Sequence, residues 1–142
     1  MAQKEEIEKS ITQYLRKQPD ILFVYLFGSF IERESYRDID VAVYFQPDIK
    51  LLRQGELIAG LELMTKVDID LIRLNRLYKK RPAFAYEILK KGRVIINKNQ
   101  EIHHLYKSKT LRYYLDTNYL RKMMDEAFEE RMKDNRFGES TL

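Results

Sequence analysis

The stretch from Ile21 to Phe45, ILFVYLFGSFIERESYRDIDVAVYF, constrains the fold more than any other part of the chain. Its first seven residues are apolar and rich in aromatic and branched side chains, which predicts a strand buried on both faces. Gly28 and Ser29 end that run. Glu32 follows Ser29 at the spacing of a capping box, so we expect a short helix to begin here with its first backbone N–H groups unpaired. Such a helix start binds phosphate readily.

Two aspartates open the second half of this stretch, Asp38-Ile39-Asp40. Strand alternation places Asp38 and Asp40 on one face and the apolar residues between and after them on the other. Two like charges on one strand face repel each other, and a divalent cation removes that repulsion. Mg²⁺ is usually held by one or two carboxylates together with substrate phosphates. The pair therefore predicts a metal–nucleotide site beside the phosphate-binding turn.

Each of these features alone also has an ordinary structural explanation. Asp-x-Asp on a strand is often solvated surface, and Gly-Ser after a strand is often only a turn and a helix cap. Their joint occurrence at this spacing, with an apolar strand on each side, favours a nucleotide site.

Gly28-Ser29 followed by Asp38-Ile39-Asp40 resembles the signature of the DNA polymerase beta-like nucleotidyltransferase superfamily. With its short length, the chain is similar to the minimal nucleotidyltransferases (MNT), the antitoxins of HEPN/MNT toxin–antitoxin pairs. The resemblance covers about residues 14–97. It implies that Gly28 and Ser29 hold the triphosphate, that Asp38 and Asp40 bind metal, and that a later strand supplies a third carboxylate. The loop over residues 30–37 is shorter than is usual in the family, so its substrate contacts are not carried over.

The third carboxylate has two candidates in the segment VDIDLIRLN, Asp68 and Asp70. Both lie on the same face of the expected strand. The later strand of the family commonly has an Asp followed, after mostly apolar positions, by an Asn. Asp70 and Asn75 fit that pattern, so the resemblance implies that Asp70 is the third catalytic and metal-binding aspartate.

The hydrophobic pattern predicts an α/β or α+β fold, with a mixed sheet of about four strands flanked by helices and a helical C-terminal end. We expect strands over residues 21–27, 38–45, 67–74 and 93–97, the last of them at a sheet edge. Helices are expected over residues 2–17, 51–64 and from Pro82 to about 91, with a basic loop before Pro82. The second of these helices would bury Leu57, Leu61 and Met64. We expect one nucleotidyltransferase domain over residues 1–142, with a motif-bearing core at about 14–97 and a helical extension at about 101–135.

The composition is that of a soluble globular protein, with 44% hydrophobic and 34% charged residues. No apolar run is long enough to cross a bilayer, and the N-terminus lacks the apolar core of a signal peptide. The chain has no cysteine, which excludes disulfides and thiol catalysis and favours the cytoplasm. Eight Lys or Arg residues lie between Arg73 and Arg93 against one acid, Glu87, which favours an anionic partner or, equally, a solvated surface.

Two other features are better explained by packing than by ligand binding. His103-His104 could suggest a metal pair, but adjacent side chains on a helix diverge. The ten tyrosines could suggest a stacking surface for nucleic acid, but no aromatic-glycine RNA motif accompanies them. We therefore expect no direct binding to nucleic acid, and none to membranes.

The predicted function is a Mg²⁺-dependent transfer of a nucleoside monophosphate from a triphosphate to an acceptor hydroxyl. Catalysis would use Asp38, Asp40 and Asp70, whose mutual repulsion argues against a site that has lost its chemistry, with two Mg²⁺ ions as cofactors. The resemblance implies ATP as the nucleotide and a tyrosine of a cognate HEPN ribonuclease toxin as the acceptor. Two alternatives remain open: a small-molecule nucleotidyltransferase of the aminoglycoside type, and a non-catalytic antitoxin that binds and occludes its toxin.

Overall fold

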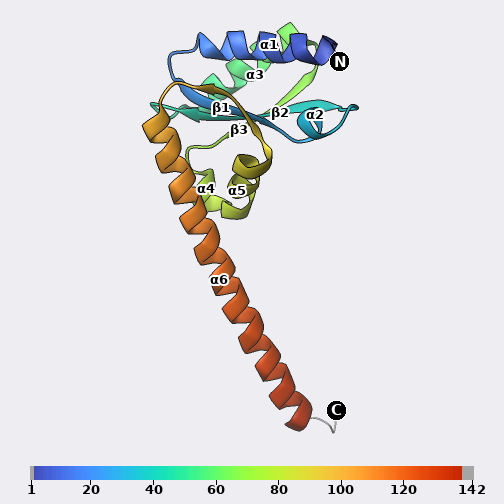
Figure 1. Cartoon of the computed structure of the whole chain (residues 1–142), viewed down its shortest axis with the longest axis vertical. Helices are drawn as coiled ribbons and strands as arrows, with labels where there is room; N and C mark the ends of the chain where they lie inside the picture. Colours follow the sequence, from blue (N-terminus) through green and yellow to red (C-terminus); the bar gives the residue numbers. More distant parts are fainter. Residues whose placement is uncertain (1, 139–142) are drawn as a thin grey trace.

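The computed structural model describes residues 2–138 of the chain. Figure 1 shows a four-stranded sheet between two layers of helices, with one long helix leading away from it. The strands are β1 (Ile21–Phe27), β2 (Asp38–Phe45), β3 (Asp68–Arg73) and β4 (Arg93–Asn97). The helices are α1 (Ala2–Arg16), α2 (Ser29–Glu32), α3 (Leu51–Thr65), α4 (Leu77–Lys80), α5 (Pro82–Lys91) and α6 (Gln100–Gly138).

The sheet has the strand order β3-β2-β1-β4 and mixed polarity. β1 lies in the middle and pairs antiparallel with both β2 and β4, whereas β2 and β3 are parallel. The predicted mixed four-stranded sheet is confirmed, and so is the position of residues 93–97 at an edge. The end of β1 and the start of β2 lie at the same end of the sheet, which places Gly28 next to the two aspartates of β2.

Both faces of the sheet are buried, as the apolar run of β1 predicted. Alternate residues of the strands pack under α1 and α3, where Ile11, Leu15, Leu57 and Leu61 are fully buried. The opposite face carries a second core that includes Phe23, Tyr25 and Ala42 from the sheet, Leu74 after β3, Ile88 of α5 and Tyr106 of α6. The aspartates of β2 lie on this second face, beyond the end of its core.

Three local predictions are corrected by the structure. The basic segment before Pro82 is not a plain loop, because Leu77–Lys80 form the short helix α4. Met64 is 39% exposed rather than buried, since α3 turns Leu57 and Leu61 to the sheet and Met64 falls at the margin of that face. The third strand is one residue shorter at each end than predicted, covering Asp68–Arg73.

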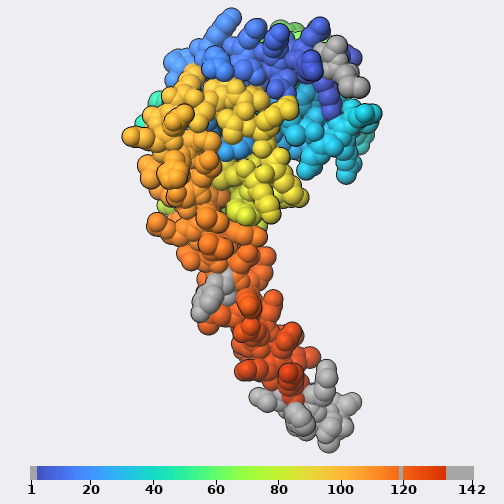
Figure 2. All heavy atoms as spheres, viewed as in Figure 1, coloured from blue at the N-terminus to red at the C-terminus, as the bar shows by residue number. Residues whose placement is uncertain are grey.

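The first half of the long helix α6 packs against the rest of the molecule. Tyr106 is buried and donates a hydrogen bond to the Leu74 carbonyl at 2.6 Å, and Tyr114 stacks on Tyr86 of α5 with ring centroids 4.1 Å apart. From Leu120 to Lys133 every described side chain is exposed. Figure 2 shows this half of α6 projecting from the globular part as a rod. Within residues 2–138, no helix combines the length and apolar character needed to span a bilayer.

His103 has a structural explanation, in line with the sequence argument. Its ring nitrogens lie 2.6 Å from the Tyr25 hydroxyl and 3.1 Å from the Asn97 amide, and burial lowers its pKa below the usual value. His104 is exposed, so the two imidazoles point to different surroundings. His103 therefore serves packing and buried hydrogen bonding.

Candidate active site

Gly28 is the turn between β1 and α2, and only glycine fits there. Its φ of 76° and ψ of −156° are values that residues with a side chain rarely adopt. A Cβ atom at this position would also overlap the Oδ2 atom of Asp40. The backbone of the turn therefore lies directly against a carboxylate of β2.

The helix begins at Ser29 as predicted, but the predicted capping box is wrong. Gly28 is the N-cap, and no side chain caps the helix. The first backbone bonds of the turn run from the N–H groups of Ile31 and Glu32 to the Gly28 carbonyl. The N–H groups of Ser29 and Phe30 precede these bonds and remain the free donors of a helix start.

The parallel pairing of β2 and β3 brings the aspartates together on one face of the sheet, as the strand alternation predicted. In the parallel pair of β2 and β3, Asp38 lies opposite Asp68 and Asp40 lies opposite Asp70. The residues between them, Ile39 and Ile69, are buried on the other face. Asp40 thus has Asp70 beside it on β3 and Gly28 beside it at the end of β1.

Asn75 fixes this register from the other end of the strand pair. Its side-chain amide accepts a hydrogen bond from the Phe45 N–H at 2.9 Å and donates one to the Phe45 carbonyl at 2.7 Å. The backbone N–H of Leu74 also donates to the Val43 carbonyl. Since a slip of one residue would turn every side chain of β3 to the opposite face, these bonds hold Asp70 opposite Asp40.

The surroundings of Asp40 disfavour the charged form of its side chain. Burial, then the negative charges of Asp38 and Asp70, and a hydrogen bond with Asp70, raise the pKa of Asp40 to about 6. The neighbour on β3 that raises this pKa is Asp70 rather than Asp68. Repulsion among these carboxylates favours either a proton or a cation between them.

The residues fit Mg²⁺ in the form in which it binds to nucleotides. Carboxylate oxygens are the hard ligands that Mg²⁺ prefers, and the ion usually takes only one or two of them, with phosphates and water completing its shell. Within residues 2–138, no three His, Cys, Asp or Glu side chains already surround one ion-sized point. A Mg²⁺ ion bound here would take one or two of these carboxylates and complete its shell with phosphates and water.

A comparison with protein families agrees with this geometry. Residues 9–101 match the family described as polymerase beta, nucleotidyltransferase, and this range includes the Gly28 turn and all the aspartates discussed above. The chain belongs to this family. No curated protein matches the sequence of this nucleotidyltransferase significantly.

Solved structures of toxin–antitoxin complexes share the fold. A chain of the MntA–HepT complex superposes with a TM-score of 0.67 at 22% identity, over 88% of this chain and 98% of that one. The complex of the tri-AMPylated HEPN toxin of Shewanella oneidensis with its MNT antitoxin gives a TM-score of 0.68 at 24% identity, over 89% and 98%. A toxin–antitoxin structure with AMP-PNP gives 0.69 at 24%, over 86% and 98%.

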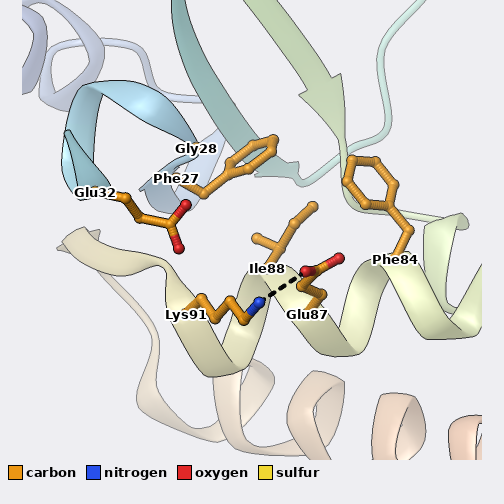
Figure 3. Close-up of a pocket in the computed structure, with 7 residues that line it drawn as sticks. All are labelled: Phe27, Gly28, Glu32, Phe84, Glu87, Ile88 and Lys91. Carbon is orange, nitrogen blue, oxygen red and sulfur yellow. Dashed lines mark hydrogen bonds and ion pairs between the residues drawn. The ribbon is translucent and has the colours of Figure 1, made fainter. Parts of the chain in front are cut away.

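The nucleotidyltransferase also has a cavity of about 180 Å³ beside Gly28 that the sequence did not predict. Figure 3 shows its lining: Phe27 and Gly28 at the end of β1, Glu32 of α2, and Phe84, Glu87, Ile88 and Lys91 of α5. Phe27 and Phe84 meet edge to face with centroids 5.9 Å apart. The spacing of Glu87 and Lys91 on one helix face was readable from the sequence, but only the fold places them next to Gly28.

Asp40→Asn is expected to stabilise the nucleotidyltransferase in EDTA by about 1–2 kcal/mol, a value discounted for solvent screening. Since the folded state raises the pKa of Asp40 from 3.8 to about 6, it binds more protons than the unfolded state between these values. The stability of the unsubstituted protein should therefore fall as the pH rises through this window, and that of Asp40→Asn should fall less. Thermal melts at pH 5 and pH 7.5 measure both effects.

The exposed Asp116 of α6 offers the control, because Asp116→Asn removes one carboxylate far from the others. Asp38→Asn should shift the melting temperature in the same direction as Asp40→Asn. A loss of several degrees in both β2 variants would instead mean that the pair is held by structural hydrogen bonds.

Proposed function

We propose that this protein transfers AMP from Mg²⁺-bound ATP to a tyrosine hydroxyl of a cognate HEPN toxin and releases pyrophosphate. The observation that carries the proposal is the gathering of Asp38, Asp40 and Asp70 on one sheet face, against the Gly28 turn. The family match supports nucleotidyl transfer. Structural neighbours that contain an AMPylated toxin or AMP-PNP support the acceptor and the nucleotide.

In this proposal some groups bind the metal and the phosphates, and another accepts a proton. Asp38 and Asp40 would hold Mg²⁺, Asp70 would complete a second site, and the bound metal would neutralise charge on the phosphates. The turn at Gly28 and Ser29 binds the outer phosphates, with the backbone N–H groups of Ser29 and Phe30 as the donors at the helix start. Asp70 accepts the proton of the acceptor hydroxyl, whose oxygen bonds to the α-phosphorus. The bond from that phosphorus to the bridging oxygen breaks, and pyrophosphate leaves with the electron pair.

The direct test is incubation of the protein with ATP labelled at the α-phosphate, Mg²⁺ and the product of the neighbouring gene. We expect label on a tyrosine of that product, and none when Asp40→Asn replaces the unsubstituted protein. Label on an aminoglycoside but on no protein would favour the small-molecule alternative. No transfer to either class of acceptor would overturn the proposal.

A second candidate function, neutralisation of the toxin by binding alone, is favoured by the outer half of α6. Leu120, Met124 and Phe128 are 59%, 71% and 61% exposed, and they continue the helix face on which Tyr106 and Thr110 pack against the rest of the molecule. A helix this exposed gains little stability without a partner on its apolar side. The proposed toxin is the partner that the neighbouring complexes suggest for this surface.

Met124→Glu should weaken toxin binding at least about tenfold, because it places a charge in the middle of the apolar stripe. Lys122→Gln is the matched control, since it also changes the net charge by one unit and lies on the opposite side of the helix. Titration calorimetry without ATP separates binding from transfer. Equal affinities of the two variants would exclude this stripe as the toxin-binding surface.

A further inference from the structure

The cavity beside Gly28 is lined by charged side chains that have no role in the proposed reaction. Its floor is apolar, formed by Phe27, Phe84 and Ile88, and its rim carries two glutamates and one lysine. Figure 3 shows Glu32 of α2 on one side and Glu87 and Lys91 of α5 on the other. Lys91 is the one cation among the residues that line this cavity.

Lys91 forms a weak contact with Glu87. Its Nζ atom lies 3.1 Å from Oε1 of Glu87, and both side chains are 57% exposed. Ion pairs of this kind between residues four apart on an exposed helix contribute little to stability. The Glu87 carboxylate also raises the pKa of Lys91, so the amine remains charged at neutral pH.

We propose that Lys91 exchanges Glu87 for the outer phosphates of the nucleotide and that Glu87 competes with the nucleotide for this lysine. The inference rests on the proposed function, because it assumes a triphosphate at the Gly28 turn. Gly28 forms part of the wall of the cavity that Lys91 lines. The outer phosphates of ATP carry more charge than one carboxylate, so they attract the ammonium group more strongly.

The release of Glu87 costs little, because its carboxylate is already largely in water. Glu32 faces the same cavity and repels an incoming polyphosphate. That repulsion makes an exposed cation on the opposite side, Lys91, more important for binding. Lys91 would then distinguish nucleotides by their outer phosphates rather than by their base.

The test is the displacement of a fluorescent ATP analogue by ATP and by AMP, in the presence of Mg²⁺. Lys91→Gln should weaken ATP binding about tenfold and leave AMP binding unchanged, since AMP lacks the outer phosphates. Glu87→Gln should strengthen ATP binding a few-fold, because it frees Lys91. Lys90→Gln is the matched control: it removes the same charge one residue away, where the lysine lies near the Tyr86 ring instead of the cavity.

Three results would overturn the inference while leaving the proposed function intact: equal ATP affinities of Lys91→Gln and Lys90→Gln, equal losses for ATP and AMP in Lys91→Gln, or weaker ATP binding by Glu87→Gln. The last result would mean that Glu87 itself contacts the ligand. Failure of the unsubstituted protein to bind ATP with Mg²⁺ would overturn the proposed function, and this inference with it.

Discussion

Asp70→Asn is expected to lose nearly all transfer activity, whereas Asp68→Asn should keep most of it. Both aspartates face the same side of β3, but Asp70 lies opposite Asp40 and contributes to its raised pKa. A general base must come within about 2.6–3.2 Å of the acceptor hydroxyl. Two residues along a strand are roughly 6.6 Å apart, so only one of the two aspartates occupies that position.

Single-turnover transfer to the partner protein, at saturating Mg-ATP, gives the comparison. Asp70→Asn should still bind the nucleotide through Asp38 and Asp40, so its defect should appear in the rate rather than in the affinity. If Asp68→Asn were the inactive variant, the third carboxylate would have to be reassigned to Asp68, and Asp70 would be left with only an electrostatic influence on Asp40.

ATP should bind tightly with Mg²⁺ and only weakly in EDTA. Asp38, Asp40 and Asp70 present negative charge to a polyphosphate, and burial together with the charges of Asp38 and Asp70 raises the pKa of Asp40. A divalent cation between the carboxylates and the phosphates reverses the sign of the interaction. Titration calorimetry in the two buffers measures the difference.

The variant with both β2 aspartates changed to Asn serves as the control for this experiment. It should lose most of the enhancement by Mg²⁺, because the proposed ligands of the ion are gone while the Gly28 turn remains. Equal affinity of the unsubstituted protein in Mg²⁺ and in EDTA would exclude these carboxylates as a metal site.

The sequence predicted the fold correctly where a periodic hydrophobic pattern coincides with a buried surface. The apolar run of β1 and the alternation after Asp38 placed both strands correctly, because a residue turned to the wrong face would leave a charge in the core. Helix α3 was also predicted within one residue of its C-terminal end. Met64 was assigned wrongly because helical spacing alone does not give the width of the face that the sheet covers.

The remaining features depend on contacts between segments that are distant in the chain. The conformation of Gly28 follows from the approach of Asp40, which no local pattern describes. The short helix α4 has no apolar repeat, and its Tyr78 packs edge to face on Tyr106 of α6, with centroids 5.5 Å apart. Likewise, Lys91 and Gly28 line one cavity only because α5 returns to the end of β1. Asn75 was noted as part of a family pattern, but its physical role became apparent only from its two bonds to Phe45.

The length of α6 separates the proposed toxin-binding surface from the proposed active site. A helix of 39 residues measures roughly 58 Å from end to end, and every described side chain from Leu120 to Lys133 is exposed. If the proposed toxin docks on Leu120, Met124 and Phe128, it must reach back along the helix to bring a tyrosine to Asp70. The length of α6 would then restrict transfer to tyrosines at a matching distance from the docking surface.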